Sequence, residues 1–168
     1  MHNIGNRPTY VSDEITLSKA IRVTGTGSIV ANILQFTGSI RIIDQYAVIT
    51  DVTTLNNATG IYATIWDGTN SIDLTADGLV LSGASVDTMF LKDQVSSQPY
   101  SVNLADQVRM NEIVDTKKAG RPFTVTNKYN TDSFIRLHLT TTDAPVDFTI
   151  MVTFKYVSII PNSTLVFL

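Results

Sequence analysis

The sequence predicts an all-β protein, an antiparallel β-sandwich of jelly-roll type with an extended N-terminal arm. Thr, Ile and Val number 23, 17 and 16, together 56 of the 168 residues, and β-branched side chains suit a pleated, half-buried surface. Several segments alternate between apolar and polar residues with a period of two, which is the pattern of a strand with one buried side. Turn residues separate about eight to ten such segments without any strand–helix–strand pattern, which favours a sandwich.

Length and composition exclude several classes of protein. A chain of 168 residues predicts one domain, which we divide into an arm over residues 1–26 and a β-sandwich over residues 27–168. The chain has no Cys, so a disulfide framework, a thiolate metal site and a Cys nucleophile are impossible. A net charge of −3 does not indicate a basic surface for nucleic acid, so no nucleic-acid partner is expected. No apolar run reaches the roughly 18 residues of a membrane helix, so no membrane partner is expected.

The first 26 residues differ from the rest because their apolar side chains are scattered among Gly, Pro and polar residues. Two interpretations stay open for this arm. It packs across a neighbouring subunit, or it is a partly ordered terminus of the kind that many domains have.

The first half of the predicted sandwich begins with two long strands, Ser28–Phe36 and Ile40–Val52, which Thr37 and Gly38 divide. A hairpin is predicted over Gly60–Thr75, because two alternating segments flank an Asp-Gly turn, and Gly accepts the positive φ of tight turns. Short strands are predicted at Leu79–Leu81 and Met89–Leu91.

The second half contains the clearest alternation in the chain, Val146–Val157, where apolar and polar residues exchange over twelve positions. Phe134–Thr142 alternates in the same way, and the intervening turn predicts that the two segments form a hairpin. Phe123–Lys128 is a further strand, and the apolar tail 165–168 should not be a free end. Asn103–Val114 stays open as a strand, a loop or a short helix that Asn103 would cap.

Three carboxylates near turns are the candidate metal ligands: Asp67, Asp73 and Asp77. Oxygen ligands of this kind could hold a hard cation such as Ca²⁺, but the spacing fails the EF-hand pattern. Asp also favours turns through local hydrogen bonds, so we predict no metal and no other cofactor. His138 is expected to be an exposed strand residue. Since no G-x-S-x-G elbow accompanies it, the sequence predicts no enzyme.

Two groups of residues are candidates for interaction with a partner. Tyr62 and Trp66 lie on the second, otherwise polar side of their strand, which suits sugar stacking or a protein interface. The alternative is a sandwich whose two faces are both partly buried. Lys117, Lys118 and Arg121 form a small basic cluster on a loop, which is either a solvated turn or a contact to an acidic patch on another subunit.

Three stretches of sequence resemble a β-rich domain of virion structural proteins in tailed bacteriophages: Ile49–Thr75, Phe90–Gln94 and Phe134–Pro145. The similarity extends over about residues 28–157. It implies a capsid decoration (cement) protein or a piece of a head or tail fibre, and no functional residue can be transferred by motif. Because the domain fills nearly the whole chain, the resemblance favours a small decoration subunit.

The resemblance implies partners as well. Such a subunit would form a homotrimer, bind the major capsid protein on the outer capsid surface and bridge neighbouring capsomers. It would be assembled in the cytoplasm of the host bacterium. The alternative is a receptor- or carbohydrate-binding module at a fibre or tail tip, in which Tyr62, Trp66 and the Asp-containing turns would form the binding site.

Overall fold

The fold is an all-β sandwich in a computed structural model that describes residues 12–74, 81, 84–91, 101–103, 123–127, 132–142 and 144–168. Eleven strands occur among these residues: β1 Ile15–Gly25, β2 Ser28–Thr37, β3 Ser39–Thr54, β4 Ala58–Trp66, β5 Ser71–Asp73, β6 Met89–Leu91, β7 Ser101–Asn103, β8 Phe123–Thr126, β9 Ser133–Thr141, β10 Val146–Ser158 and β11 Thr164–Phe167. The described part of the chain has no helix that is long and apolar enough to cross a membrane.

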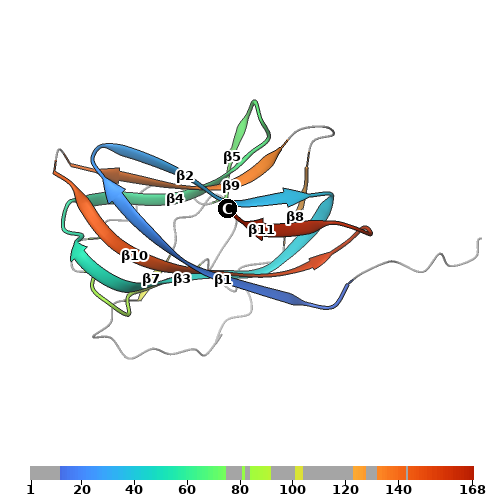
Figure 1. The fold of residues 1–168 in the computed structure, drawn as a ribbon, viewed down its shortest axis with the longest axis horizontal. Coiled ribbons are helices and arrows are strands. Elements are labelled where there is room, and N and C mark those ends of the chain that lie inside the picture. Colours follow the sequence, from blue (N-terminus) through green and yellow to red (C-terminus); the bar gives the residue numbers. More distant parts are fainter. Residues whose placement is uncertain are drawn as a thin grey trace, which may run out of the picture.

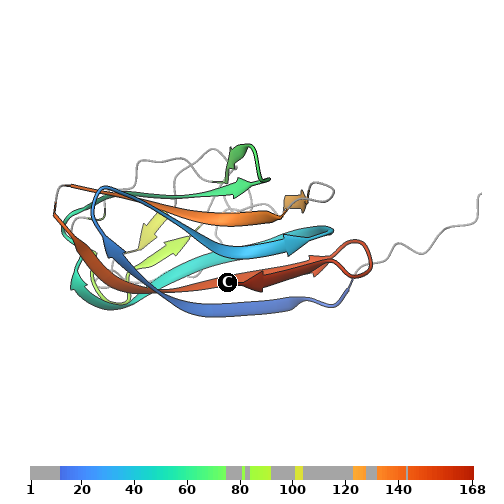
Figure 2. The same cartoon turned by 45° about the horizontal axis from the view of Figure 1, so that its top comes forward.

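The strands form two antiparallel sheets that pack face to face, as Figure 1 shows. The first sheet has the order β1-β10-β3-β6-β7, with β8 also paired to β3, and the second has the order β11-β2-β9-β4-β5. Figure 2 shows the long strands of each layer side by side.

The strand pairing confirms the predicted jelly roll. Four antiparallel pairs, β1–β10, β2–β9, β3–β6 and β4–β5, form one long ribbon. This ribbon is wound so that successive pairs fall in alternate sheets, giving β1-β10-β3-β6 opposite β2-β9-β4-β5. Two four-stranded sheets in this arrangement are the eight-stranded jelly roll. β7, β8 and β11 are additions at the margins.

The apolar core lies between the sheets and follows the period-two pattern. On β10 the side chains of Phe148, Ile150 and Phe154 are almost completely buried, as are Ile135 and Leu139 on β9. These residues belong to one contiguous cluster that both sheets supply. Burying apolar surface is the main favourable term in folding, so the alternation seen in the sequence accounts for the sandwich.

The predicted hairpin between Phe134–Thr142 and Val146–Val157 is wrong in its pairing. The two strands form at these positions, but β9 lies in the second sheet between β2 and β4. β10 lies in the first sheet between β1 and β3. The turn after β9 therefore carries the chain from one sheet to the other. Alternation indicates which side of a strand is buried, but it does not indicate which neighbour completes the ladder.

The N-terminal segment also differs from the prediction of an arm over residues 1–26. Residues 15–25 form β1, which pairs with β10 from Ile15↔Tyr156 to Gly25↔Val146. The alternation was hidden because exposed Lys19 falls on the side of the strand that otherwise carries apolar residues. Its Nζ donates to the main-chain oxygen of Leu168, so the amine has a partner at the margin of the sandwich. Residues 1–11 lie outside the described residues.

Most of the remaining predicted strands are present, and the others fall on residues that the structure does not describe. Strands form within or close to Ser28–Phe36, Ile40–Val52, Met89–Leu91 and Phe123–Lys128, and the tail joins the second sheet as β11. The hairpin over Gly60–Thr75 is present as β4 and β5. Residues 79–80 and 104–114 lie outside the described residues. The strand predicted at Leu79–Leu81 therefore stays a prediction. The strand, loop and helix alternatives for Asn103–Val114 stay open beyond residue 103.

Candidate interaction surface

The outer side of the second sheet gathers the aromatic residues that the sequence singled out. Tyr62 and Trp66 both project from β4 on the side away from the core, and neighbouring β9 supplies Phe134, Arg136 and His138. We call these five residues the aromatic face. The sequence placed Arg136 and His138 on a polar side of their own strand. It could not place that strand beside β4, because the pairing is non-local.

Side-chain contacts across β4 and β9 order the aromatic face. The rings of Tyr62 and His138 stack, with centroids 4.4 Å apart and planes 15° apart. The guanidinium carbon of Arg136 lies 4.1 Å from the ring centroid of Trp66. Cross-strand aromatic pairs and cation–π contacts of this kind stabilise a sheet surface. One side of each aromatic ring is thus covered by a residue of β9.

Polar side chains of β4 and β2, on either side of β9, form hydrogen bonds with His138 and Arg136. His138 Nε2 lies 2.9 Å from the hydroxyl oxygen of Thr64, a residue that is only 1% exposed. Arg136 Nε donates to Asn32 Oδ1 on β2 at 2.7 Å. His138 is therefore half-buried and hydrogen-bonded, and it is not the exposed strand residue that the sequence predicts. Tyr62 and Trp66 are also half-buried, and both of the predicted alternatives for them stay predictions.

The strands of the two sheets differ in charge. β2, β4, β9 and β11 of the second sheet contain a single charged residue, Arg136, and β5 adds Asp73. β1, β3 and β10 contain seven charged residues: Lys19, Arg22, Arg41, Asp44, Asp51, Asp147 and Lys155. Exposed apolar side chains continue the aromatic face onto its neighbours, with Val30 of β2 50% exposed and Val166 of β11 47% exposed.

Ion pairs occupy the outer face of the first sheet. Arg22 donates two hydrogen bonds to the carboxylate of Asp147, at 2.9 and 2.8 Å. This hydrogen bonding lowers the pKa of Asp147 and raises the pKa of Arg22. Lys155 pairs with Glu14, and the hydrogen bond between them raises the pKa of Lys155. This face has the composition of an ordinary solvent-exposed surface.

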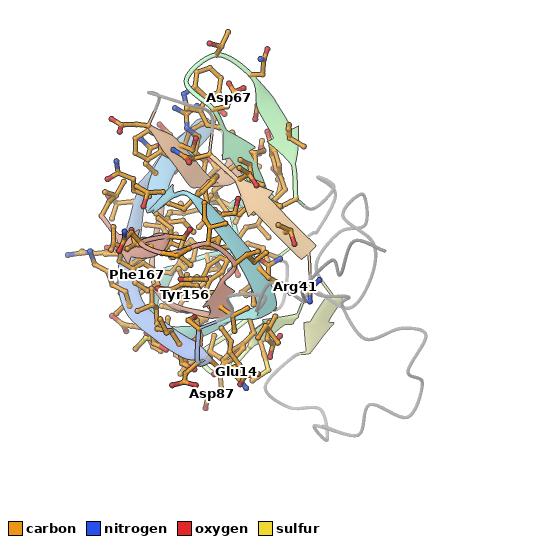
Figure 3. The ribbon with its side chains drawn as sticks, turned by 90° about the vertical axis from the view of Figure 1, so that its right-hand side faces the viewer. Glu14, Arg41, Asp67, Asp87, Tyr156 and Phe167 are labelled. Carbon is orange, nitrogen blue, oxygen red and sulfur yellow. The ribbon has the colours of Figure 1, made fainter. Side chains whose placement is uncertain are left out.

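Of the three candidate cation ligands, the structure describes the side chain of Asp67 alone. Asp67 Oδ1 accepts hydrogen bonds from the main-chain amides of Thr69 and Asn70, at 2.9 and 2.6 Å. Its carboxylate therefore closes the β4–β5 turn, where Figure 3 shows it. Asp73 lies on β5, and Asp77 is outside the described residues. No group of three His, Cys, Asp or Glu that could hold a metal occurs in the described ranges.

The basic cluster of Lys117, Lys118 and Arg121 falls outside the part of the chain that the structure describes. Its role in an interaction stays a prediction.

Comparison with known proteins gives little further information. No protein-family model matches the chain, and no curated protein matches its sequence. Among solved structures, the chain is similar to one described as the structure of infectious bursal disease virus, Gx strain. The TM-score is 0.41 at 12% sequence identity, and the match covers 98% of this chain but 39% of that chain. A likeness at this level assigns neither a family nor a function.

Proposed function

We propose that this protein is a structural component of a virion, a decoration protein that binds the outer surface of a tailed-phage capsid through its aromatic face. The observation that carries the proposal is the jelly-roll order of the strands, because viral capsid domains are among the proteins built on this fold. The resemblance of residues 28–157 to phage virion proteins points to the same class. Since a fold hosts many functions, the surface must also be considered.

The composition of the aromatic face supports a protein contact. Protein interfaces are enriched in Tyr, Trp, Phe and Arg and depleted in Lys, Glu and Asp, and the strands β2, β4 and β9 follow both trends. The Arg136 side chain is the only charged group on these strands and is held against Trp66. A neutral or weakly acidic partner surface fits this face best, because it would leave no buried like charge.

In this proposal the protein acts by binding and not by catalysis. Its partners are the major capsid protein and two further copies of the chain in a homotrimer on the outer capsid surface. Neither nucleic acid nor a membrane takes part. A cyclic trimer needs two different patches per subunit, and the basic cluster of Lys117, Lys118 and Arg121 is our candidate for the second.

The test places one new charge on each outer face. Val30→Glu puts a carboxylate beside the aromatic face, at a position that does not belong to the core. Ala20→Glu does the same on the outer face of the first sheet, where Ala20 is exposed. Binding to purified capsids is measured by co-sedimentation. We expect Val30→Glu to weaken binding about tenfold or more and Ala20→Glu to leave it unchanged.

Equal binding by the two variants would show that the aromatic face is not the capsid-binding surface. Electron microscopy of particles that carry the bound protein then tests the location independently. Density at fibre ends instead of capsid faces would contradict the decoration role.

A second candidate, a receptor- or carbohydrate-binding module, rests on the same surface. Tyr62 and Trp66 lie four residues apart on one side of β4, with Thr64 between them and the polar groups of Asn32 and Arg136 close by. Aromatic rings with hydrogen-bonding neighbours are the elements of a sugar site. A glycan array separates the two candidates, because glycan binding that Trp66→Ala abolishes would favour the module over a purely structural role.

A further inference from the structure

A buried glutamine interrupts the apolar core. Gln45 of β3 is 4% exposed and lies opposite Phe154 of β10. A register shift between Lys155 and Tyr156 passes over one residue of β3, so that Tyr156 pairs with Ile42 and Lys155 with Asp44. Without this β-bulge, strict alternation from buried Ile42 would turn Asp44 inward and Gln45 outward.

The amide group of Gln45 has no hydrogen-bond partner among the described residues. Neither Nε2 nor Oε1 forms a hydrogen bond with another atom of this part of the chain. A buried amide without partners is unfavourable, and native proteins usually satisfy such groups with protein atoms or with an ordered water. We therefore expect a small polar ligand to form hydrogen bonds with the Gln45 amide.

Gln45 is one of the residues that line a cavity of about 20 Å³. Apart from Gln45, its walls are mostly apolar side chains from both sheets, among them Ile33, Ala47, Ile61, Leu137 and Ile150. A single water needs about 10–15 Å³ measured in this way. The cavity therefore has room for one water and is too small for an organic ligand.

The strand pairing leaves main-chain polar groups of β3 near Gln45 without a described neighbouring strand on one side. β8 pairs with Ser39–Ile42 and β6 with Tyr46–Val48. Between them, residues 43–45 of β3 have no described strand on that side. Main-chain groups of this stretch can therefore serve as the additional partners that a bound water requires.

We propose that Gln45 and the adjacent main chain of β3 bind one ordered water molecule inside the sandwich. The amide either donates to this water through Nε2 or accepts from it through Oε1. The site is independent of the aromatic face and of the proposed function, since it lies between the two sheets.

The experiment uses the full chain and solution NMR. Methyl protons do not exchange with solvent, so a cross-peak between the methyl group of Ala47 or Ile61 and the water frequency reports a long-lived water in the cavity. We expect these cross-peaks in the natural sequence and their loss in Gln45→Met, which keeps the side-chain length without the amide. Gln35→Met is the matched control, because Gln35 is a glutamine of β2 that donates to Asp132. This control should keep the cross-peaks.

Two outcomes would overturn the proposal. Absence of methyl–water cross-peaks in the natural sequence excludes a long-lived water, whether or not Gln45→Met folds. The hydroxyl of Tyr46, a residue at the cavity wall, could imitate the signal by exchanging its proton. Tyr46→Phe should therefore keep the cross-peaks, and their loss in that variant would assign the signal to the hydroxyl.

Discussion

Gly38 shows how closely single residues are fitted at the corners of this sandwich. It lies between β2 and β3 with φ +68°, a conformation that costs other residues about 1–2 kcal/mol. Its amide donates to Asn127 Oδ1 at 2.7 Å, and the next amide, that of Ser39, donates to Ser163 Oγ at 2.9 Å. The corner thus joins the segments after β8 and before β11.

A matched pair of glycine substitutions tests this residue. A Cβ at Gly38 would lie 2.3 Å from Ser163 Oγ and 3.1 Å from its Cα, whereas a Cβ at Gly27, with φ +74°, meets nothing within 4 Å. We expect Gly27→Ala to lower the free energy of unfolding by about 1 kcal/mol. Gly38→Ala should lower it by about 2 kcal/mol or more, because overpacking adds to the backbone cost.

Chemical denaturation measures both values. In a chain that already carries Ser163→Gly, Gly38→Ala should lower the free energy of unfolding by less than it does in the natural sequence, because the closest atoms have been removed. Equal costs for Gly27→Ala and Gly38→Ala would show that the corner tolerates the added methyl group.

The Arg22–Asp147 pair predicts a dependence of stability on pH. Because folding lowers the pKa of Asp147 from its ordinary value of 3.8, its stabilisation is present above that value and is lost as pH falls through the folded-state pKa. Asp147→Asn should lower the melting temperature at neutral pH, and the difference should vanish in strong acid. The effect should also weaken with added salt, since both groups are accessible to solvent.

Thermal melts at a series of pH values make this comparison. Asp13→Asn is the control, because Asp13 is exposed and forms no ion pair within the described residues. A difference for Asp147→Asn that persists unchanged in strong acid would contradict the assignment to this ion pair.

At the scale of elements, β1 is the strand whose role the structure changes most. Most of its side chains are exposed, and only Val23 is buried, while Leu17 and Ile21 pack partly against the core. Its main contribution is to pair along β10. Without β1, the edge of β10 would present unpaired main-chain groups beside an apolar interior, which is a site for aggregation.

Truncation tests the role of β1. A chain beginning at Ser28 should lose cooperative thermal unfolding and should aggregate, because β10 loses its neighbour and Val23 leaves the core. A chain beginning at Ser12 keeps β1 and is the control for loss of the first eleven residues. Circular dichroism and light scattering report the two properties. A stable, monomeric chain from Ser28 would instead favour the arm that the sequence predicts.

At the scale of the whole molecule, the jelly roll is held together by pairings between distant parts of the chain. β1 pairs with β10, β2 with β9 and β2 with β11. Each of these contacts must close a long loop before it contributes any stability. Such a topology folds slowly in comparison with helical proteins of similar size.

We therefore expect refolding in the range of milliseconds to seconds. The single tryptophan of the chain, Trp66, lies on β4 opposite Phe134 of β9, so its fluorescence reports formation of the second sheet. Stopped-flow dilution from denaturant measures the rate. Refolding within microseconds would show that local contacts are sufficient to form the fold.

The class of the fold and the position of most long strands could be predicted from local patterns in the chain. The alternation over Val146–Val157 and the Asp-Gly turn before β5 are local signals, and period-two burial follows directly from strand geometry. The hairpin of β4 and β5 could be predicted because its two strands adjoin in the chain. The low charge of the second sheet was also present in the composition, but it could not be assigned to a face.

The identity of neighbouring strands, in contrast, depends on contacts between distant parts of the chain. Hydrogen-bonded ladders between distant strands separated β9 from β10, incorporated residues 15–25 as β1 and brought Arg136 and His138 against Trp66 and Tyr62. A β-bulge turned Gln45 into the core. Local periodicity fixes which side of a strand is buried, whereas pairing and register depend on the packing of the whole core. The candidate surface and the buried glutamine site follow from that packing.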